Sequence, residues 1–175
     1  MQILKYEKVD ASFKPWNEEY FNVANSLIEF IQNERFKVIH IGSTSAKVSG
    51  KGIIDLSLLY EMDQLKEAVN YVKSLGFQDQ TGKKLFPRER PRKDGMVIFN
   101  EKKYNIHIHL ILNGSIEHRK QIKFREFMLE NPWARKKYEE SKLEILEKGI
   151  IEQEEYGKEK SVFVKSVIEE LENIE

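Results

Sequence analysis

Residues 40–60 have the sequence HIGSTSAKVSGKGIIDLSLLY, and the rest of the fold can be worked out from this segment. Residues 36–41 are rich in β-branched side chains and stop at Gly42, which predicts a strand followed by a tight connection. Residues 53–60 then alternate, with apolar side chains at the even positions and with Asp55 and Ser57 on the opposite face. We therefore expect two strands that present one apolar face to the core and one polar face to a site.

The connection at Gly42, Ser43, Thr44 and Ser45 has the composition of a phosphate-binding turn. Glycine permits unusual backbone angles and close approach, while the hydroxyls and backbone amides are donors for an anion. A short helix that starts after the hydroxyls would add the partial positive charge of its first-turn amides. The alternative is that the hydroxyls only satisfy local backbone groups. We interpret His40 as a structural bridge between the strand and this turn.

Hydrophobic periodicity predicts the remaining elements on both sides of this segment. Helices are predicted at 16–32, 117–130, 132–148 and 152–173, and another helix, capped by Asp63, ends near Gly76. Strands are predicted at 85–88, 96–100 and 104–112, with a hairpin turn at Asp94-Gly95. Strands in the middle and helices at both ends predict an α+β fold. Its mixed, mostly antiparallel sheet is covered by helices and followed by a C-terminal helical part.

The composition is that of one ordinary globular domain spanning residues 1–175. Of these residues 33% are charged and 40% are hydrophobic, and 29 Lys and Arg balance 29 Asp and Glu. The absence of Cys favours a reducing, cytoplasmic location and excludes a Cys-ligated zinc site. No run approaches about 18 apolar residues, so we expect no membrane partner. A net charge near zero, without a basic-aromatic platform, predicts no nucleic-acid partner, and oligomeric state has no signature in the sequence.

A carboxylate in the middle of a half-buried strand is costly unless it is paired, hydrogen-bonded or metal-bound, so Asp55 requires a partner. In the strand 104–112, His107 and His109 lie on one face that is able to neighbour Asp55. A carboxylate with two imidazoles is a candidate catalytic set and a candidate metal site. The alternatives are histidines that only form hydrogen bonds or contact a phosphate directly, and an Asp55 that is bonded to the turn amides.

Basic side chains gather in the segment 83–93, with one Glu among them. If the strand 85–88 edges the sheet, Arg88, Arg90 and Arg92 reach toward the polar face and receive an anionic substrate by bidentate contacts. Lys51, four residues before Asp55, is placed to touch a phosphate or to pair with that carboxylate. The alternative is that each of these residues is an ordinary solvated side chain on the protein surface.

Residues 40–45, followed by 51–56, resemble the most distinctive stretch of the GrpB family and, through it, the polymerase-beta-like nucleotidyltransferase fold. The resemblance continues through 105–110 and 123–128, and it covers about residues 13–167. Further matching positions follow in the same order along the chain: Asn131, Pro132, Tyr138, Lys142, Tyr156 and Lys160.

The resemblance implies a Gly-Ser turn that holds a nucleoside triphosphate beside carboxylates that bind divalent cations. Asp55 matches the first carboxylate, whereas Ser57, a weak neutral ligand, stands where the second is expected. The expected cofactor is then a divalent metal, Mg, Mn or Zn, bound by Asp55 with His107 and His109. 

Two basic residues on predicted helices, Arg125 and Lys142, match family positions and would complete an anionic pocket, with surface ion pairs as the alternative. The function implied is that of a nucleotidyltransferase-like protein that binds a nucleotide or another phosphorylated small molecule. Two alternatives remain open. One is a non-catalytic binding module that lost the second carboxylate at Ser57, and the other is a metal-dependent phosphohydrolase that uses the histidines.

Overall fold

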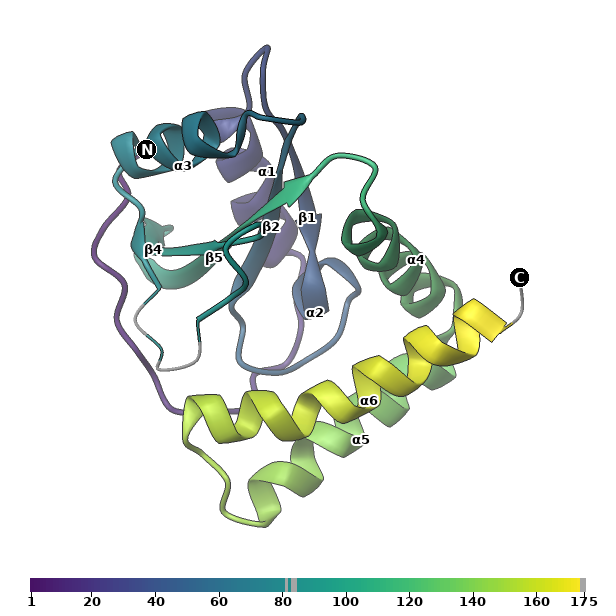
Figure 1. The fold of residues 1–175 in the computed structure, drawn as a ribbon. Helices are drawn as coiled ribbons and strands as arrows, with labels where there is room; N and C mark the ends of the chain where they lie inside the picture. The colour runs from purple at the N-terminus through teal and green to yellow at the C-terminus, as the bar shows by residue number, and fades with distance from the viewer. Residues whose placement is uncertain (81, 83–84, 174–175) are drawn as a thin grey trace.

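A five-stranded sheet with helices on both faces forms the centre of the molecule (Figure 1). The computed structural model describes residues 1–80, 82 and 85–173. Within these residues the strands are β1 (Lys37–Ile41), β2 (Ile54–Tyr60), β3 (Gln78–Asp79), β4 (Arg92–Phe99) and β5 (Lys102–Leu112). The helices are α1 (Glu19–Ile31), α2 (Gly42–Ser45), α3 (Leu65–Ser74), α4 (Ile116–Glu130), α5 (Pro132–Glu147) and α6 (Gln153–Asn173).

The strand order is β1-β2-β5-β4-β3, and the pairs are antiparallel except for the parallel pair β2 and β5. The prediction of an α+β fold with a mixed, mostly antiparallel sheet is therefore confirmed. The parallel pair arises because the chain leaves β2, crosses through α3 and returns through the β4 and β5 hairpin. Among the described residues, no helix combines the length and apolar character that crossing a membrane requires.

The two faces of the sheet have different partners. The apolar face of β2 and β5 packs against α1 and α3, and its centre holds fully buried side chains such as Leu27, Leu56 and Ile108. The opposite face carries the polar side chains of the same strands and contacts α4. This separation follows from the alternation of side chains along a strand.

A second, smaller core joins the C-terminal helices to the end of α2. Ala46 and Val48, which follow α2, pack with Phe124 of α4, Tyr138 of α5 and Val167 of α6. Helices α5 and α6 run side by side below the sheet in Figure 1. Through this cluster, residues far along the chain are brought against the turn that follows β1.

The predicted hairpin at Asp94-Gly95 is wrong, because both residues lie inside β4 and residues 85–88 form no strand. Gly95 is required there for packing, since a Cβ atom would lie 2.7 Å from Cδ1 of Phe77. The hairpin turn instead lies at Asn100 and Glu101, whose φ angles of 47° and 62° suit a tight two-residue turn.

Two local predictions also need correction. Asp63 does not cap α3, because its φ is 69° and the helix starts after Gln64 without a side-chain cap. The short helix expected after the hydroxyl residues instead begins at Gly42 and contains them as α2.

Candidate functional site

A row of polar side chains crosses three neighbouring strands on the polar face of the sheet. Asp55 of β2 lies opposite His107 of β5, which in turn lies opposite Asp94 of β4. His107 Nδ1 lies 3.2 Å from Oδ1 of Asp55, and His109 Nε2 lies 3.5 Å from the same oxygen. The structure therefore brings Asp55 together with both histidines, because the strands that carry them are direct neighbours.

Gly42 lies directly against the carboxylate of Asp55. A Cβ atom at position 42 would come within 2.7 Å of Asp55 Oδ2, and the backbone there has a φ of 72°. Both facts require glycine, since a side chain would clash with the carboxylate and would strain a left-handed backbone. The α2 turn is thus packed on a carboxylate whose side chain is 23% exposed.

Hydrogen bonds link the carboxylate to the N-terminal segment. Burial lowers the pKa of His107, so the imidazole is neutral near pH 7. Its Nδ1 is then assigned as donor to Asp55, and its Nε2, 3.3 Å from the Tyr6 hydroxyl, as acceptor. Gln153 Nε2 donates to the Tyr6 oxygen at 2.9 Å, which completes a chain of donors directed at Asp55.

The carboxylate of Asp55 stays ionised in this environment. Burial acts to raise its pKa, but the hydrogen bonds from His107 and His109 outweigh burial and hold the pKa well below its usual range. The result is an anionic oxygen pair beside α2 at neutral pH, which is the form that accepts a proton or repels a second anion.

Of the basic segment, Arg92 is the residue that reaches the polar face. It makes a bidentate ion pair with the fully buried Asp94, at 2.7 and 2.9 Å, and stacks over Phe86 beside His109. Arg90 instead pairs with Glu117 of α4 at 3.3 Å, and Arg88 is exposed. Neither is brought to Asp55 in the structure. Lys83 and Lys84 lie outside the described residues.

Lys142 of α5 is the basic side chain in direct contact with the turn. Its Nζ donates to Ser43 Oγ at 3.0 Å and to the Ser49 carbonyl at 2.7 Å, and the residue is 1% exposed. Gly50 makes this possible, because a Cβ atom there would lie 2.8 Å from Nζ. Lys142 lies on the same face of α5 as the buried residues Ala134, Tyr138 and Ile145. Its burial was therefore predictable from the helical periodicity of the sequence.

Two further lysines, Lys51 and Lys160, interact electrostatically with Asp55. Lys51, in the loop before β2, is half-buried, lies over the ring of Tyr156 and has its pKa lowered to about 8 by burial and by the charge of Lys160. Lys160 of α6 is also half-buried, and the neighbouring Tyr138 and Asp55 raise its pKa. The resemblance contained Lys160, but no pattern in the sequence indicated that it approaches Lys51.

Thr44, Ser45 and His40 serve the local structure of the turn. The Thr44 hydroxyl lies 2.9 Å from Nε2 of His40, whose pKa burial lowers to about 4, and Ser45 Oγ donates to the Gly42 carbonyl at 2.8 Å. Arg125 Nη1 donates to the His40 carbonyl at 3.0 Å, so it braces the end of β1. Of the three hydroxyls, Ser43 is the one that meets a buried cation.

Comparison with protein families identifies the chain. The model of the GrpB protein family matches residues 8–170. The chain belongs to the GrpB family. No curated protein matches this GrpB chain.

Solved structures share the fold of this GrpB chain at low sequence identity. A cytoplasmic RNA terminal U-transferase aligns at a TM-score of 0.50 and 11% identity, over 73% of this chain and 40% of that one. Cid1, described as having RNA terminal uridylyl transferase activity, aligns at a TM-score of 0.52 and 11% identity, over 74% and 40%. Polymerase beta of Leishmania infantum aligns at a TM-score of 0.38 and 17% identity, over 66% and 52%. The first two alignments show that the chain has the nucleotidyltransferase-like fold, and the chain spans about two-fifths of those two proteins.

The residues of this GrpB chain do not fit a magnesium site of the kind that the fold implies. Within the described part of the chain, no group of three or more His, Cys, Asp or Glu side chains is arranged to hold a metal ion. Ser57 is fully buried and donates to Gln121 Oε1 of α4 at 2.8 Å, so the position expected for a second carboxylate is closed by a helix. The Asp55 carboxylate lies against both His107 and His109 instead.

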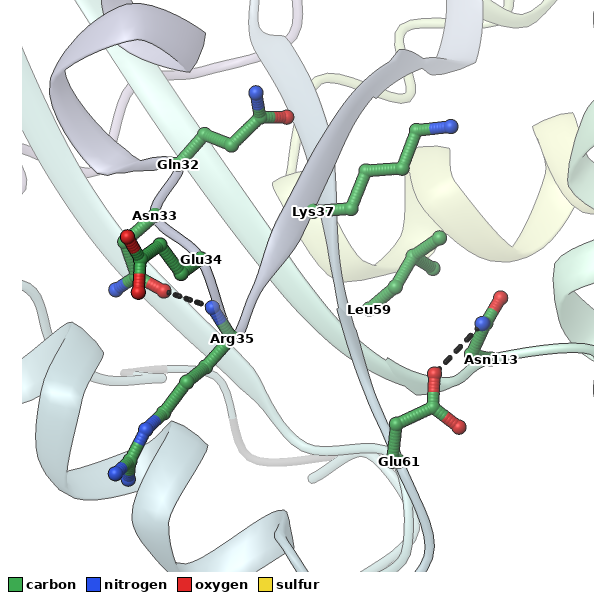
Figure 2. Close-up of a pocket in the computed structure, with 8 residues that line it drawn as sticks. All are labelled: Gln32, Asn33, Glu34, Arg35, Lys37, Leu59, Glu61 and Asn113. Carbon is green, nitrogen blue, oxygen red and sulfur yellow. Dashed lines mark hydrogen bonds between the residues drawn. The ribbon is translucent and has the colours of Figure 1, made fainter.

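A separate pocket lies away from this site. It is lined by residues at the start of β1, the ends of β2 and β5 and the loop after α1 (Figure 2). Its lining residues are Gln32, Asn33, Glu34, Arg35, Lys37, Leu59, Glu61 and Asn113. Asp55 lies at the other end of β2, so this pocket contains none of the residues singled out in the sequence.

Proposed function

We propose that this GrpB-family protein binds a nucleotide or another phosphorylated small molecule at the α2 turn, beside Asp55, and acts on it as a nucleotidyltransferase. The observation that carries this proposal is the contact between the buried Lys142 ammonium and Ser43, in the turn that also packs on Asp55. The Lys142 amine, the Ser43 hydroxyl and the ionised Asp55 carboxylate therefore all lie against the α2 turn. Cation and hydroxyl bind phosphate oxygens, and the carboxylate faces the incoming acceptor.

Asp55 takes the role of general base in this proposal. It is ionised at neutral pH, and His107 fixes its orientation through the hydrogen bond to Oδ1. A base of this kind accepts the proton of an attacking hydroxyl as its oxygen bonds to the α-phosphorus of the nucleoside triphosphate and the bond to the departing pyrophosphate breaks. His109, whose side chain is 14% exposed, lies beside the same oxygen and is the more accessible of the two imidazoles.

A second candidate function is a binding module without catalysis, and the environment of Ser57 favours it. Its buried hydroxyl is committed to Gln121, so the carboxylate that would share a cation with Asp55 is replaced by a structural contact. A protein of this kind keeps the phosphate site and performs no transfer.

The test combines binding with turnover. The purified protein is incubated with each of the four nucleoside triphosphates and candidate hydroxyl acceptors, with Mg²⁺, Mn²⁺, Zn²⁺ or no metal, and pyrophosphate release is measured. Release that is lost in Asp55→Asn and kept in Asp10→Asn, an exposed control, supports transfer. Binding without release supports the module. Absence of both binding and release for every nucleotide would contradict the two functions together.

A further inference from the structure

Three lysine side chains from three separate elements interact with the carboxylate of Asp55. Lys51 comes from the loop before β2, Lys142 from α5 and Lys160 from α6. Their charges interact, since Lys160 opposes the protonation of both Lys51 and Lys142, and Asp55 favours the protonation of all three. A site with three lysines around one carboxylate carries an excess of positive charge when all are protonated.

Acids near the lysines act on them without forming a direct ion pair: Glu139 favours the protonation of Lys142, and Glu152 favours that of Lys51. Within the described residues none of the three forms an ion pair with a carboxylate, and the one that is nearly fully buried, Lys142, bonds to the neutral oxygens of Ser43 and Ser49. Its ammonium lies 4.2 Å from the ring centre of Tyr138. A buried ammonium without a counter-charge is unfavourable. Burial therefore holds the pKa of Lys142 well below its usual range, and an anion bound beside it would favour the charged form again.

Asp55 does not supply the missing charge. Its Oδ1 is taken by His107 and lies beside His109, and its Oδ2 faces Gly42. The other acid on this face, Asp94, is held in the bidentate pair with Arg92. Asp55 and Asp94 are thus engaged by histidine and arginine, while Glu139 accepts from the Ser49 amide and Glu152 pairs with Lys8.

We propose that Lys51, Lys142 and Lys160 form a receptor for an oligophosphate group, and that their ammonium groups supply the charge that a divalent cation would otherwise supply, so binding needs no metal. This inference rests on the proposed function and specifies its ligand class. Lysine binds phosphate as a compact point charge with three donors, so three such groups match a ligand with more than one phosphate. In this arrangement the lysines replace the cation that a second carboxylate at position 57 would help to bind.

Inorganic tripolyphosphate is the probe that tests this receptor. Calorimetric titration is carried out at pH 7 on the full chain, once in EDTA and once in Mg²⁺. We expect binding in EDTA, weakened about tenfold or more in each of Lys51→Gln, Lys142→Met and Lys160→Gln, the loss expected for one charge-assisted hydrogen bond. The matched controls Lys136→Gln on α5 and Lys158→Gln on α6 remove exposed lysines from the same helices and should bind as the parent does.

The variant at the buried position has its own safeguard. If Lys142→Met does not fold, the half-buried Lys51 and Lys160 carry the test, because their side chains are not part of the packed core. Gly50→Ala gives an independent measurement. Its Cβ displaces the Lys142 ammonium without removing the charge, so it should weaken binding in EDTA while a Gly157→Ala control, with open space around position 157, does not.

Three results would overturn the inference. Binding that appears in Mg²⁺ and not in EDTA shows that a metal supplies the charge, and it leaves the proposed function intact. Binding in EDTA that the lysine variants do not weaken places the anion elsewhere. No binding of tripolyphosphate in either buffer removes the receptor, whereas the proposed function is judged separately by nucleotide binding and pyrophosphate release.

Discussion

The ammonium nitrogen of Lys142 lies 3.0 Å from the hydroxyl oxygen of Ser43, although 99 positions separate the two residues in the chain. Ser43 belongs to the turn after the first strand of the sheet, and Lys142 belongs to a helix that packs on that turn through the second core. The C-terminal helices therefore contribute to the candidate site as well as covering it. This relationship, together with the packing of Gly42 on Asp55, leads to four predictions.

Gly42→Ala should destabilise the protein and displace the Asp55 carboxylate. The added Cβ would lie 2.7 Å from Oδ2, and the φ of 72° by itself costs a non-glycine residue about 1–2 kcal/mol. Gly114→Ala is the matched control, since its φ is 70° and nothing lies within 4 Å of the new Cβ. Urea denaturation should show a larger loss of unfolding free energy at position 42. Equal losses in the two variants would contradict the close contact with Asp55.

Asp55→Asn should lower stability in a pH-dependent manner. Because the folded-state pKa of Asp55 is held well below its ordinary value, ionised Asp55 stabilises the fold above pH about 4, and this contribution is lost as the pH falls through the folded-state pKa. We expect a loss of about 1–3 kcal/mol at pH 7, the range for hydrogen bonds to a charged group. Denaturation curves from pH 7 to pH 2 should show the difference shrinking. A difference in unfolding free energy that stays constant with pH would mean that His107 and His109 do not hold the folded-state pKa of Asp55 below its ordinary value.

Ser57→Asp should destabilise the protein in the absence of divalent cations. The side chain is fully buried and bonded to Gln121, so a carboxylate there becomes a buried unpaired charge beside Asp55, at a cost of about 3 kcal/mol or more. Mg²⁺ should recover part of the loss, since two carboxylates on one face create a site for a hard cation. Ser57→Ala, which only loses the hydrogen bond, should cost about 1 kcal/mol and gain nothing from Mg²⁺. Full stability of Ser57→Asp in EDTA would show that α4 does not close this position.

Tripolyphosphate binding should weaken as the pH rises above about 8 and should take up protons in that range. Burial lowers the pKa of Lys51 to about 8, and a bound anion raises it again because the charged form is then favoured. The groups that face Lys51 are Lys160, Asp55, Arg92, Glu152 and the ring of Tyr156. Calorimetry at pH 8.5 in two buffers of different ionisation enthalpy measures the uptake. Lys51→Gln should reduce it, and an unchanged uptake would assign the proton to another group.

Predictions that depended on local periodicity agree with the structure. Alternation along residues 53–60 and 104–112 placed Asp55, His107 and His109 on one face, and the structure brings the three together. The hairpin was misplaced for a different reason. Asp94-Gly95 has the composition of a turn, but Arg92 and Phe77 hold these residues inside a strand, and their influence is tertiary.

The positions of the basic residues also depended on tertiary contacts that local periodicity does not predict. Arg90 and Arg92 were both expected near the polar face. Arg92 lies there because of the register of β4 on β5, whereas Arg90 pairs with Glu117 of α4. Tyr6 was not singled out, since nothing in its local sequence indicates that the N-terminal segment returns to His107.

By itself, the sequence determined the long helices, the two faces of the central strands and the tight turn at Gly42, because these depend on side-chain alternation and backbone freedom over a few residues. Tertiary structure decided which charges meet there. Lys142 reaches Ser43 through helix packing across about half of the chain, Lys160 interacts with Asp55 from α6, and Ser57 is closed off by Gln121 from another helix. Which charged groups interact depends on their distances in space, and these distances are fixed only once the core has folded.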